Sequence, residues 1–376
     1  MTTSIGLYTI IWIVASLIVL YQYVHREKKS SLYDIRSGLY AKKKLSIVAV
    51  ICIAGLFTLY NVFVTSTSVV MGSDRLNYVA NFNGLRTSPS ISLMFLMHII
   101  HRVNGSIETL FYFTTFFCVF LTLIAYRRSK DATPLSFVLL CVTQYFLITL
   151  TAIKQSYTSA FAVLFFVLIL EYKSKKASFL AIACIILACL FHTTGYVLIP
   201  LYIMVKSPKN RYNLFIYGIV LLILVFAFEP AMLALARIVT PIIPRLGGQL
   251  TAYFSDTSGN ASDGIAISFI KGLPYYFITI YAVFKRNTLK DRINNYDNYL
   301  LVIATGSFLY FVSIYSGWLS RFVHLFSFVS FVFFGLLMKE VRIPSNRTIY
   351  KGFMFVSLAI ETYRFLYLVY ALWGGF

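Results

Sequence analysis

The sequence predicts an all-helical (all-α), polytopic protein that crosses a membrane about twelve times, and three observations lead to this fold class. First, 59 % of the residues are hydrophobic and 12 % are charged, whereas a soluble domain carries about 25 % charged residues. Second, the apolar residues gather in runs of about 20, the length that a helix needs to cross a bilayer. Third, lysine and arginine concentrate in alternate loops. We expect one integral membrane domain over residues 1–376.

The net charge of +20 does not indicate a nucleic-acid-binding protein. The basic residues lie in short loops between apolar runs, and they form no stripe on a soluble domain. The five cysteines all fall inside apolar runs, and none has CxxC spacing. We therefore interpret the cysteines as small buried hydrophobic residues and expect neither disulfides nor a metal site from them.

Twelve apolar runs are candidate membrane spans. The first, Ile5–Val24, is longer than the apolar part of a signal peptide, so we expect it to remain as a helix. The runs 133–170 and 177–205 are each too long for one helix, and we divide them at TAIKQ and at FHTTG, where polar residues interrupt the pattern. The expected spans are 4–24, 45–65, 107–126, 133–151, 155–170, 177–191, 193–205, 212–228, 265–284, 298–315, 319–338 and 349–371.

The basic residues predict how these spans are oriented. Of the 33 lysines and arginines, 24 lie in six loops that alternate along the chain. Cytoplasmic loops of membrane proteins carry such an excess of positive charge. The six loops are 25–44, 127–130, 171–176, 206–211, 285–292 and 339–351. Both termini are therefore expected on the outer face.

Two long loops are predicted on that outer face. Loop 66–106 contains an apolar stretch, 91–103, which we expect to lie in the membrane interface as a short helix. Loop 229–264 is longer than a connection needs and carries Arg237 and Arg245. Long loops in compact proteins are usually functional or disordered. We interpret loop 229–264 as a cover over a substrate, with a floppy connector as the alternative.

Polar side chains at the outer ends of the spans predict a site. Charges near hydrocarbon are costly and need a partner or a wet cavity. Several polar side chains are expected at the same depth near the outer face of the membrane, which indicates a shared outward-facing polar cavity. For any single member, snorkelling or helix capping is the alternative. The members are Asp74 with Arg75, Lys154 with Gln155, His192, and Arg321 with His324.

Residues 71–82, MGSDRLNYVANF, are the most distinctive stretch of the first outer loop. Asp74, Tyr78 and Phe82 are spaced by four, so on a helix they share one face. Asp74 is also one of only 13 acidic residues in the chain. An ordinary solvated loop with a turn at Gly72 is the alternative.

Motifs for other chemistries are missing from the sequence. His98 and His101 stand one helical turn apart, but no third ligand has a recognisable spacing and HExxH does not occur, so no metal site is expected. No nucleotide-binding loop or nucleophile elbow is present either. We therefore expect no cofactor and no ATPase of the chain's own.

Three segments resemble the EpsG group of bacterial Wzy-type polysaccharide polymerases: GSDRLNYVANF, TAIKQSYTSAFAV and LACLFHTTGYVLIPLY. Thr151 stands where the family usually has asparagine, and Lys154 where it has arginine. Lysine keeps the charge but loses the bidentate fork of arginine, and Arg321 is our first candidate to supply that fork. The residues that match the family's pattern are Gly72, Asp74, Tyr78, Phe82, Ile153, Lys154, Gln155, Phe191, His192 and Thr194.

The resemblance implies a glycosyltransferase in the bacterial inner membrane with its active site facing the periplasm or the cell exterior. Such an enzyme joins oligosaccharide repeat units carried on undecaprenyl pyrophosphate, without a metal, and partners such as a flippase and a chain-length regulator are implied. The implied fold is a bundle like that of the multispan lipid-sugar glycosyltransferases (GT-C type). In these, an early acidic residue of the first outer loop commonly serves as base, and Asp74 is suitably placed.

The reaction itself needs cations for the departing pyrophosphate, a base for the acceptor hydroxyl and an apolar flank for the lipid. Asp74 is the expected base, with His192 as its rival because imidazole ionises near neutral pH. Lys154 and Arg321 are the expected cations. The further substrate-binding candidates are Arg75, Tyr78, Gln155, Thr194, Arg237, Arg245 and His324.

Three other functions stay open at this point. A flippase or sugar permease usually shows an internal repeat and polar residues at mid-membrane, whereas the polar residues here gather at the outer face and no repeat is evident. A ligase acting on the same lipid-linked glycan shares arginine and histidine chemistry at the outer face. A purely structural membrane scaffold is the third alternative.

Overall fold

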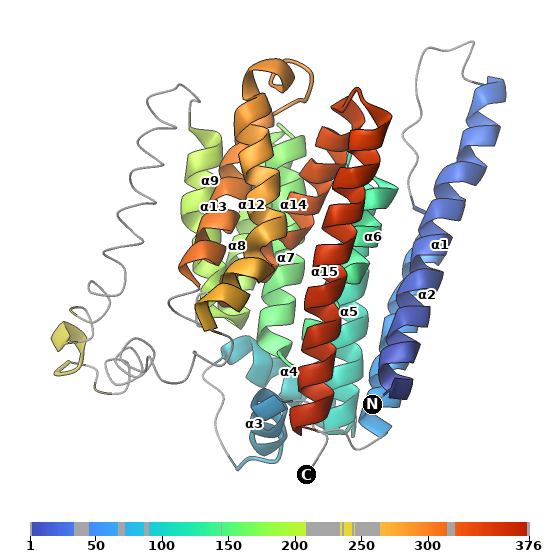
Figure 1. The fold of residues 1–376 in the computed structure, drawn as a ribbon. Helices are drawn as coiled ribbons and strands as arrows, with labels where there is room; N and C mark the ends of the chain where they lie inside the picture. The colour runs from blue at the N-terminus through green and yellow to red at the C-terminus, as the bar shows by residue number, and fades with distance from the viewer. Residues whose placement is uncertain are drawn as a thin grey trace. The chain divides into compact units, whose positions relative to one another are not determined.

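The structure, a computed structural model, is helical throughout the part of the chain that it describes (Figure 1). That part comprises residues 2–33, 45–66, 72–85, 90–143, 145–207, 264–313 and 320–373, with short pieces between 234 and 244. No β-strand occurs within these ranges. The predicted all-helical class is therefore confirmed for the described residues.

The chain divides into two compact units, which are described separately. The first comprises residues 1–200 and 327–376, and the second comprises residues 201–326. The helices of the first unit are α1 (Thr2–Tyr33), α2 (Ile47–Ser66), α3 (Gly72–Phe82), α4 (Ile91–Arg102), α5 (Ile107–Arg128), α6 (Pro134–Val142), η2 (Leu147–Leu150), α7 (Ile153–Glu171), α8 (Lys175–Phe191), η3 (Thr193–Val197) and α15 (Pro344–Trp373). The second unit contains α12 (Gly264–Leu289) and α13 (Tyr296–Val312), while α9 (Leu198–Lys206) and α14 (Ser320–Glu340) cross the boundary.

Five described helices are long and apolar enough to cross a membrane. This supports a polytopic membrane protein, while the number twelve stays a prediction. The expected span 212–228 lies outside the described residues. The five segments are Ile5–Val24, Ile47–Thr65, Ile107–Arg128, Ile153–Glu171 and Arg321–Glu340.

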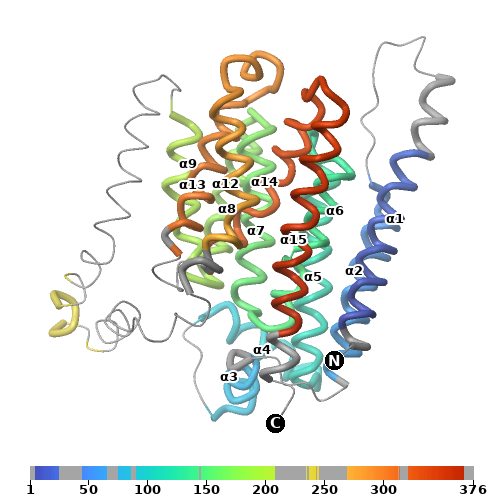
Figure 2. The backbone as a smooth tube through the Cα atoms, in the orientation of Figure 1, coloured from blue at the N-terminus to red at the C-terminus, as the bar shows by residue number. Residues whose placement is uncertain are grey.

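The core of the first unit forms around α7. This helix packs against α5 and α8, and most of its residues are buried (Figures 1 and 2). From Ala160 to Leu170 its sequence is apolar on all sides, as expected of a helix surrounded by other helices. The predicted divisions at TAIKQ and FHTTG are confirmed, because α7 begins at Ile153 and α8 ends at Phe191.

The expected span 133–151 is not one continuous helix. It begins as predicted, with Pro134 in the first turn and a capping box between Thr133 and Ser136. The helix then ends at Val142, and a short 3₁₀ helix follows. The side chain of Thr143 explains the interruption, because its hydroxyl donates to the Leu140 carbonyl at 2.7 Å and so competes with the helical pattern.

The carbonyl groups at this interruption find partners on other helices. The Tyr8 hydroxyl of α1 donates to the Cys141 carbonyl at 2.9 Å and lies 3.3 Å from the Thr143 carbonyl. The Thr362 hydroxyl of α15 donates to the Val142 carbonyl. Because a bilayer offers no water to such groups, a broken helix at membrane depth requires partners of this kind. The interruption thereby ties α1 and α15 to α6.

The ends of the first unit agree with the predicted alternation of loops. Two predicted cytoplasmic loops meet, since the Ser129 hydroxyl donates to Glu171 Oε1 at 2.5 Å. At the other end, the start of α1 and the end of α15 lie at the level of α3 and α4 (Figure 1). Which end faces the cytoplasm stays a prediction from the positive charges.

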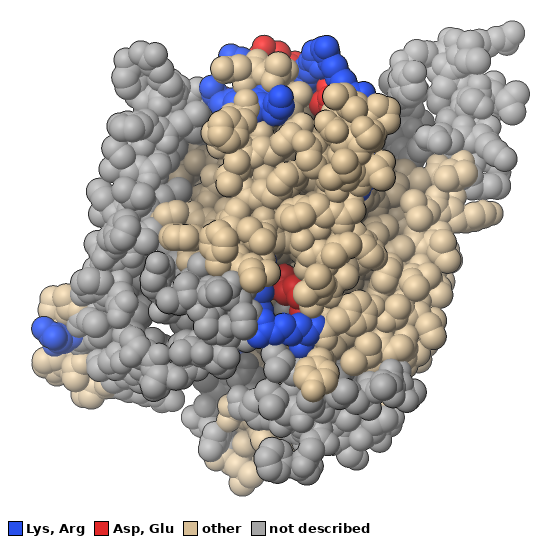
Figure 3. Space-filling model, in the orientation of Figure 1, with Lys and Arg blue, Asp and Glu red and all other residues tan. Residues whose placement is uncertain are grey.

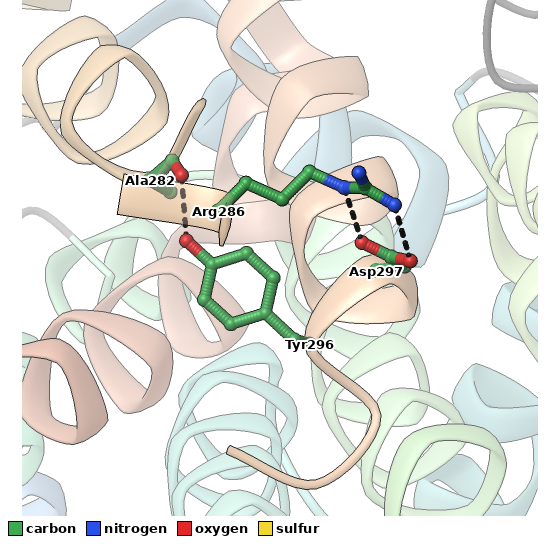
Figure 4. A network of polar contacts seen from close by, with 4 residues as sticks. All are labelled: Ala282, Arg286, Tyr296 and Asp297. Carbon is green, nitrogen blue, oxygen red and sulfur yellow. Dashed lines mark hydrogen bonds and ion pairs between the residues drawn. The ribbon is translucent and has the colours of Figure 1, made fainter. Parts of the chain in front are cut away.

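In the second unit, α12 and α13 form an antiparallel pair joined by a basic turn. Arg286 and Asp297 form a bidentate ion pair with two N–O distances of 2.8 Å (Figure 4). The Tyr296 hydroxyl donates to the Ala282 carbonyl at 2.6 Å and closes the same turn. Lysine and arginine side chains gather over this turn, and beyond it the visible surface of α12 is largely uncharged (Figure 3). We expect a modest contribution to stability from the ion pair, because it is partly exposed.

Candidate functional site

The stretch GSDRLNYVANF forms the helix α3, as the spacing of its residues predicts. Tyr78 and Phe82 are both buried, so the shared face of this helix points into the first unit. Tyr78 packs edge-on against Phe111 of α5, with ring centroids 6.3 Å apart. Asp74 belongs to the first turn of α3, but its side chain lies outside the description. An ordinary solvated loop is therefore excluded for this stretch.

The helix α4 forms within the stretch that we expected to be an interfacial helix, and it is tied to α3. The His101 ring stacks on Phe82 with centroids 3.9 Å apart, and His101 Nε2 lies 2.9 Å from the Phe82 carbonyl oxygen. Leu93, Met97 and Ile100 are the buried side of α4. Within the described residues, no three potential ligands group into a metal site. His101 packs α3 and α4 together.

Ser90 connects α4 to the end of α8. Its oxygen accepts from the Leu93 amide and caps α4. Its hydroxyl lies 3.2 Å from the carbonyl oxygens of both Leu190 and Phe191, at the end of α8. Carbonyls at a helix end lack intrahelical partners, and this hydroxyl supplies one. The first loop is thereby held beside the segment that carries His192.

His192 links α8 to the short helix η3. Its Nδ1 accepts from the Thr194 amide at 3.2 Å and lies 2.9 Å from the Thr194 hydroxyl oxygen. Because Nδ1 accepts a hydrogen bond here, a neutral ring carries its hydrogen on Nε2. Gly195 allows the close approach that follows, since a Cβ there would lie 2.6 Å from the Ala188 carbonyl carbon. The FHTTG segment is therefore a capped turn packed against its own preceding helix.

Lys154 and Gln155 belong to the first turn of α7, beside that end of α8. Gln155 is buried and Lys154 is partly exposed. One turn further on, the Thr158 hydroxyl lies 3.1 Å from both the Lys154 carbonyl and the Ala188 carbonyl. Thr158 thus fixes the start of α7 against the end of α8. Lys154, Gln155, His192 and Thr194 consequently belong to the same end of one helix pair.

Arg75 occupies an unexpected position. The sequence predicted it as a cation beside Asp74, yet its side chain is only 9 % exposed. Nη2 donates to the Thr65 hydroxyl at 3.0 Å, and the guanidinium carbon lies 4.1 Å from the ring centroid of Phe111. Burial lowers the pKa of the Arg75 guanidinium, and the field of Glu108 opposes that shift. Arg75 therefore packs against α2 and α5.

Asn61 supports Arg75 and was missed by sequence reasoning. It is fully buried in α2, and its amide donates to the Thr115 hydroxyl at 2.7 Å and lies 3.2 Å from the Phe111 carbonyl. The Thr65 hydroxyl in turn donates to the Asn61 carbonyl at 2.8 Å. A lone asparagine inside an apolar span was the available signal, because such a residue needs partners within the protein.

Two buried hydroxyls lie beside each other near this network. They belong to Tyr157 of α7 and Thr114 of α5. The Tyr157 ring stacks on Phe191, with centroids 4.2 Å apart and an interplanar angle of 9°. The stacking fixes the Tyr157 ring against the end of α8. The sequence carried no distinct signal for this pair.

The predicted site residues thus divide between the two units. Seven of them belong to the first unit, where α7 contacts α8 directly and α3 is linked to the end of α8 through α4. These seven are Asp74, Arg75, Tyr78, Lys154, Gln155, His192 and Thr194. Arg321 and His324 belong to the second unit, at the start of α14, and their meeting with the others stays a prediction. Arg237 lies in a short described piece and is exposed, while Arg245 and most of loop 229–264 lie outside the described residues.

Chemically, this end of the first unit combines several groups. It contains an acidic residue on α3, an ammonium group on α7, an imidazole after α8 and a buried guanidinium. Acid–base groups and cations of this kind suit the transfer of a group from an anionic leaving group.

Comparison with known proteins places the chain in a family. The model of the EpsG family matches residues 48–372, which is most of the chain. No curated protein and no solved structure matches the chain. The match includes α3, the start of α7 and the end of α8, the three segments in which the sequence resembles that family. The chain belongs to the EpsG family.

Proposed function

We propose that this protein is a Wzy-type polysaccharide polymerase that joins oligosaccharide repeat units carried on undecaprenyl pyrophosphate. Membership of the EpsG family suggests polymerase-like activity on a polysaccharide in the membrane. The observation that carries the proposal is the gathering of three segments, α3, the start of α7 and the end of α8, at one end of the first unit. These segments are far apart in sequence, and each carries polar residues that the reaction needs.

In the proposed reaction, an acceptor hydroxyl attacks the anomeric carbon of the donor glycan. The new glycosidic bond forms as the bond from the anomeric carbon to the pyrophosphate oxygen breaks, and undecaprenyl pyrophosphate leaves with the bonding electrons. The hydroxyl proton passes to a base of the enzyme. A cation stabilises the negative charge that develops on the leaving group. The proposal involves no metal and no other cofactor.

Asp74 is the proposed base, and the geometry of His192 supports this choice. His192 Nδ1 already accepts from the Thr194 amide, so a neutral ring has Nε2 as a donor. To accept a proton at Nε2, the ring would have to move its hydrogen to Nδ1 and lose the cap. We therefore assign His192 the role of shaping the turn and donating to the substrate.

Lys154 is the proposed cation within the first unit. It lies in the first turn of α7, is partly exposed, and adds its charge to the positive end of the helix. Arg321 and His324 are proposed to join it, and Tyr78, Gln155, Thr194, Arg237 and Arg245 to contact the glycan. The bundle is proposed to be of the GT-C type, in the bacterial inner membrane with its site on the outer face. A flippase and a chain-length regulator are the proposed partners.

The glycan profile of a deletion strain tests the function. Loss of the polymer ladder with one repeat unit retained on the surface supports a polymerase. Loss of all surface-attached glycan with accumulation of long lipid-linked polymer would instead identify a ligase. Retention of the donor on the cytoplasmic face would identify a flippase.

A further inference from the structure

The guanidinium group of Arg75 is fixed but incompletely bonded. Nη2 donates to Thr65 at 3.0 Å, and the group lies over the Phe111 ring at 4.1 Å. Nη1 is buried and has no hydrogen-bond partner among the described residues. A buried, charged donor without an acceptor is costly, so its presence calls for an acceptor from elsewhere.

The acidic neighbour of Arg75 does not meet this need. Glu108 lies in the first turn of α5, and its field reaches Arg75. Nη1 of Arg75 has no hydrogen-bond partner on Glu108 or on any other residue of the described part of the chain. The supporting network of Thr65 and Asn61 occupies only the Nη2 side of the guanidinium. Nη1 can therefore still donate a hydrogen bond to an oxygen atom that the described chain does not provide.

A second feature favours a negatively charged oxygen at the same place. Arg75 lies in the first turn of α3, a helix of 11 residues. Amide groups in the first turn of a helix lack intrahelical partners and carry partial positive charge, which attracts anions. The start of α3 and the unpartnered Nη1 of Arg75 thus both favour a bound anion.

We propose that Arg75 and the first turn of α3 form a subsite for an oxyanion of the lipid-linked glycan, either a carboxylate of an acidic sugar or a phosphate oxygen. This rests on the proposed function, in which such a glycan is the substrate. Arg75 is suited to the task because its planar fork stays charged and is already oriented by Phe111 and Thr65. Because this packing already orders the Arg75 side chain, binding an anion costs less conformational entropy.

The test measures binding of two probe anions to the full chain purified in lipid nanodiscs. Sodium glucuronate represents the carboxylate, and sodium inorganic pyrophosphate represents the phosphate, at matched ionic strength. A bound anion raises the unfolding temperature with concentration. We expect Arg75→Gln to weaken binding of one probe on the order of 10- to 100-fold, the loss typical of a charge-assisted hydrogen bond. Arg102→Gln, an exposed arginine at the end of α4, is the matched control and should leave binding unchanged.

The two probes identify the source of the oxyanion. Loss of glucuronate binding alone assigns the subsite to an acidic sugar, and loss of pyrophosphate binding alone assigns it to the lipid phosphate. Equal binding of both probes by wild type and Arg75→Gln overturns the proposal, and so does the lack of stabilisation of wild type by either probe. These results do not depend on polymer formation, so a failed subsite and a failed polymerase are distinguishable.

A second variant covers the case in which Arg75→Gln does not fold. Arg75→Lys keeps a positive charge at this buried position but lacks the planar fork of arginine. Under the proposal, Arg75→Lys binds the effective probe more weakly than wild type, whereas Arg102→Lys binds it equally well. Unchanged binding of both probes by Arg75→Lys overturns it.

Discussion

At the scale of the residue, Asp74 and His192 are rival bases that substitution separates. Asp74→Asn keeps size and hydrogen bonding but removes the basic carboxylate, so we expect chain extension to fall on the order of 10²- to 10⁴-fold. His192→Gln should retain partial activity, because in our account the ring caps the short helix η3 and does not take the proton. The measurement is the glycan ladder of a deletion strain complemented by each variant. Normal ladders with Asp74→Asn would remove Asp74 from the chemistry.

Lys154 is the second residue whose role can be measured. We expect Lys154→Ala to reduce chain extension about 10²- to 10³-fold at normal protein level, because it removes a cation from the leaving group. Arg321→Ala should act in the same direction. Lys154→Arg should be tolerated, since it keeps the charge and adds a bidentate fork. The ladder at matched expression is again the readout, and normal extension by Lys154→Ala would move the cation role elsewhere.

At the scale of the element, the interruption between α6 and η2 depends on Tyr8. Tyr8→Phe removes only the hydroxyl that bonds to the Cys141 carbonyl, and we expect a loss of about 1–3 kcal/mol in the free energy of unfolding. Thermal unfolding in nanodiscs, followed through the fall in midpoint, measures the effect. Tyr367→Phe on the exposed side of α15 is the matched control. Equal midpoints for Tyr8→Phe and wild type would show that the interruption does not need this donor.

Most helices could be predicted because apolar runs and charged loops fix where they begin and end. The expected spans 155–170 and 177–191 differ from α7 and α8 by no more than two residues at either end. The interruption after Val142 could not be predicted, because no glycine or proline stands near Thr143 in this apolar run. The hydroxyl groups that donate to the carbonyl groups at this interruption come from α1 and α15, and only folding brings these helices near.

The places of the candidate site residues along the helices could be predicted, whereas their packing contacts could not. The spacing of polar residues at helix ends identified α3, Lys154 and His192, because their position follows from the order of the spans. The inward direction of Arg75 was not predictable, since it depends on Phe111 and Thr65 lying beside α3. The network of Asn61 depends in the same way on the packing of α2 against α5.

At the scale of the whole molecule, the positive charges predict the direction of every span. We expect both termini and loop 229–264 outside, because 24 of the 33 basic residues lie in loops of the opposite face. In a background without the native cysteines, a single cysteine at Ser258 should react with a membrane-impermeant reagent in intact cells. A cysteine at Ser174, which caps α8, should not react. The reverse pattern would contradict the topology.

The central claim is that the chain extends a lipid-linked glycan, and the surface glycan of a deletion strain tests it most directly. Electrophoresis of that glycan should show a single repeat unit without a ladder, and the wild-type gene should restore the ladder. The Asp74→Asn variant, present at equal level in the membrane, should not restore it. A full ladder in the deletion strain, or long lipid-linked polymer that accumulates without transfer to the surface, would contradict the account.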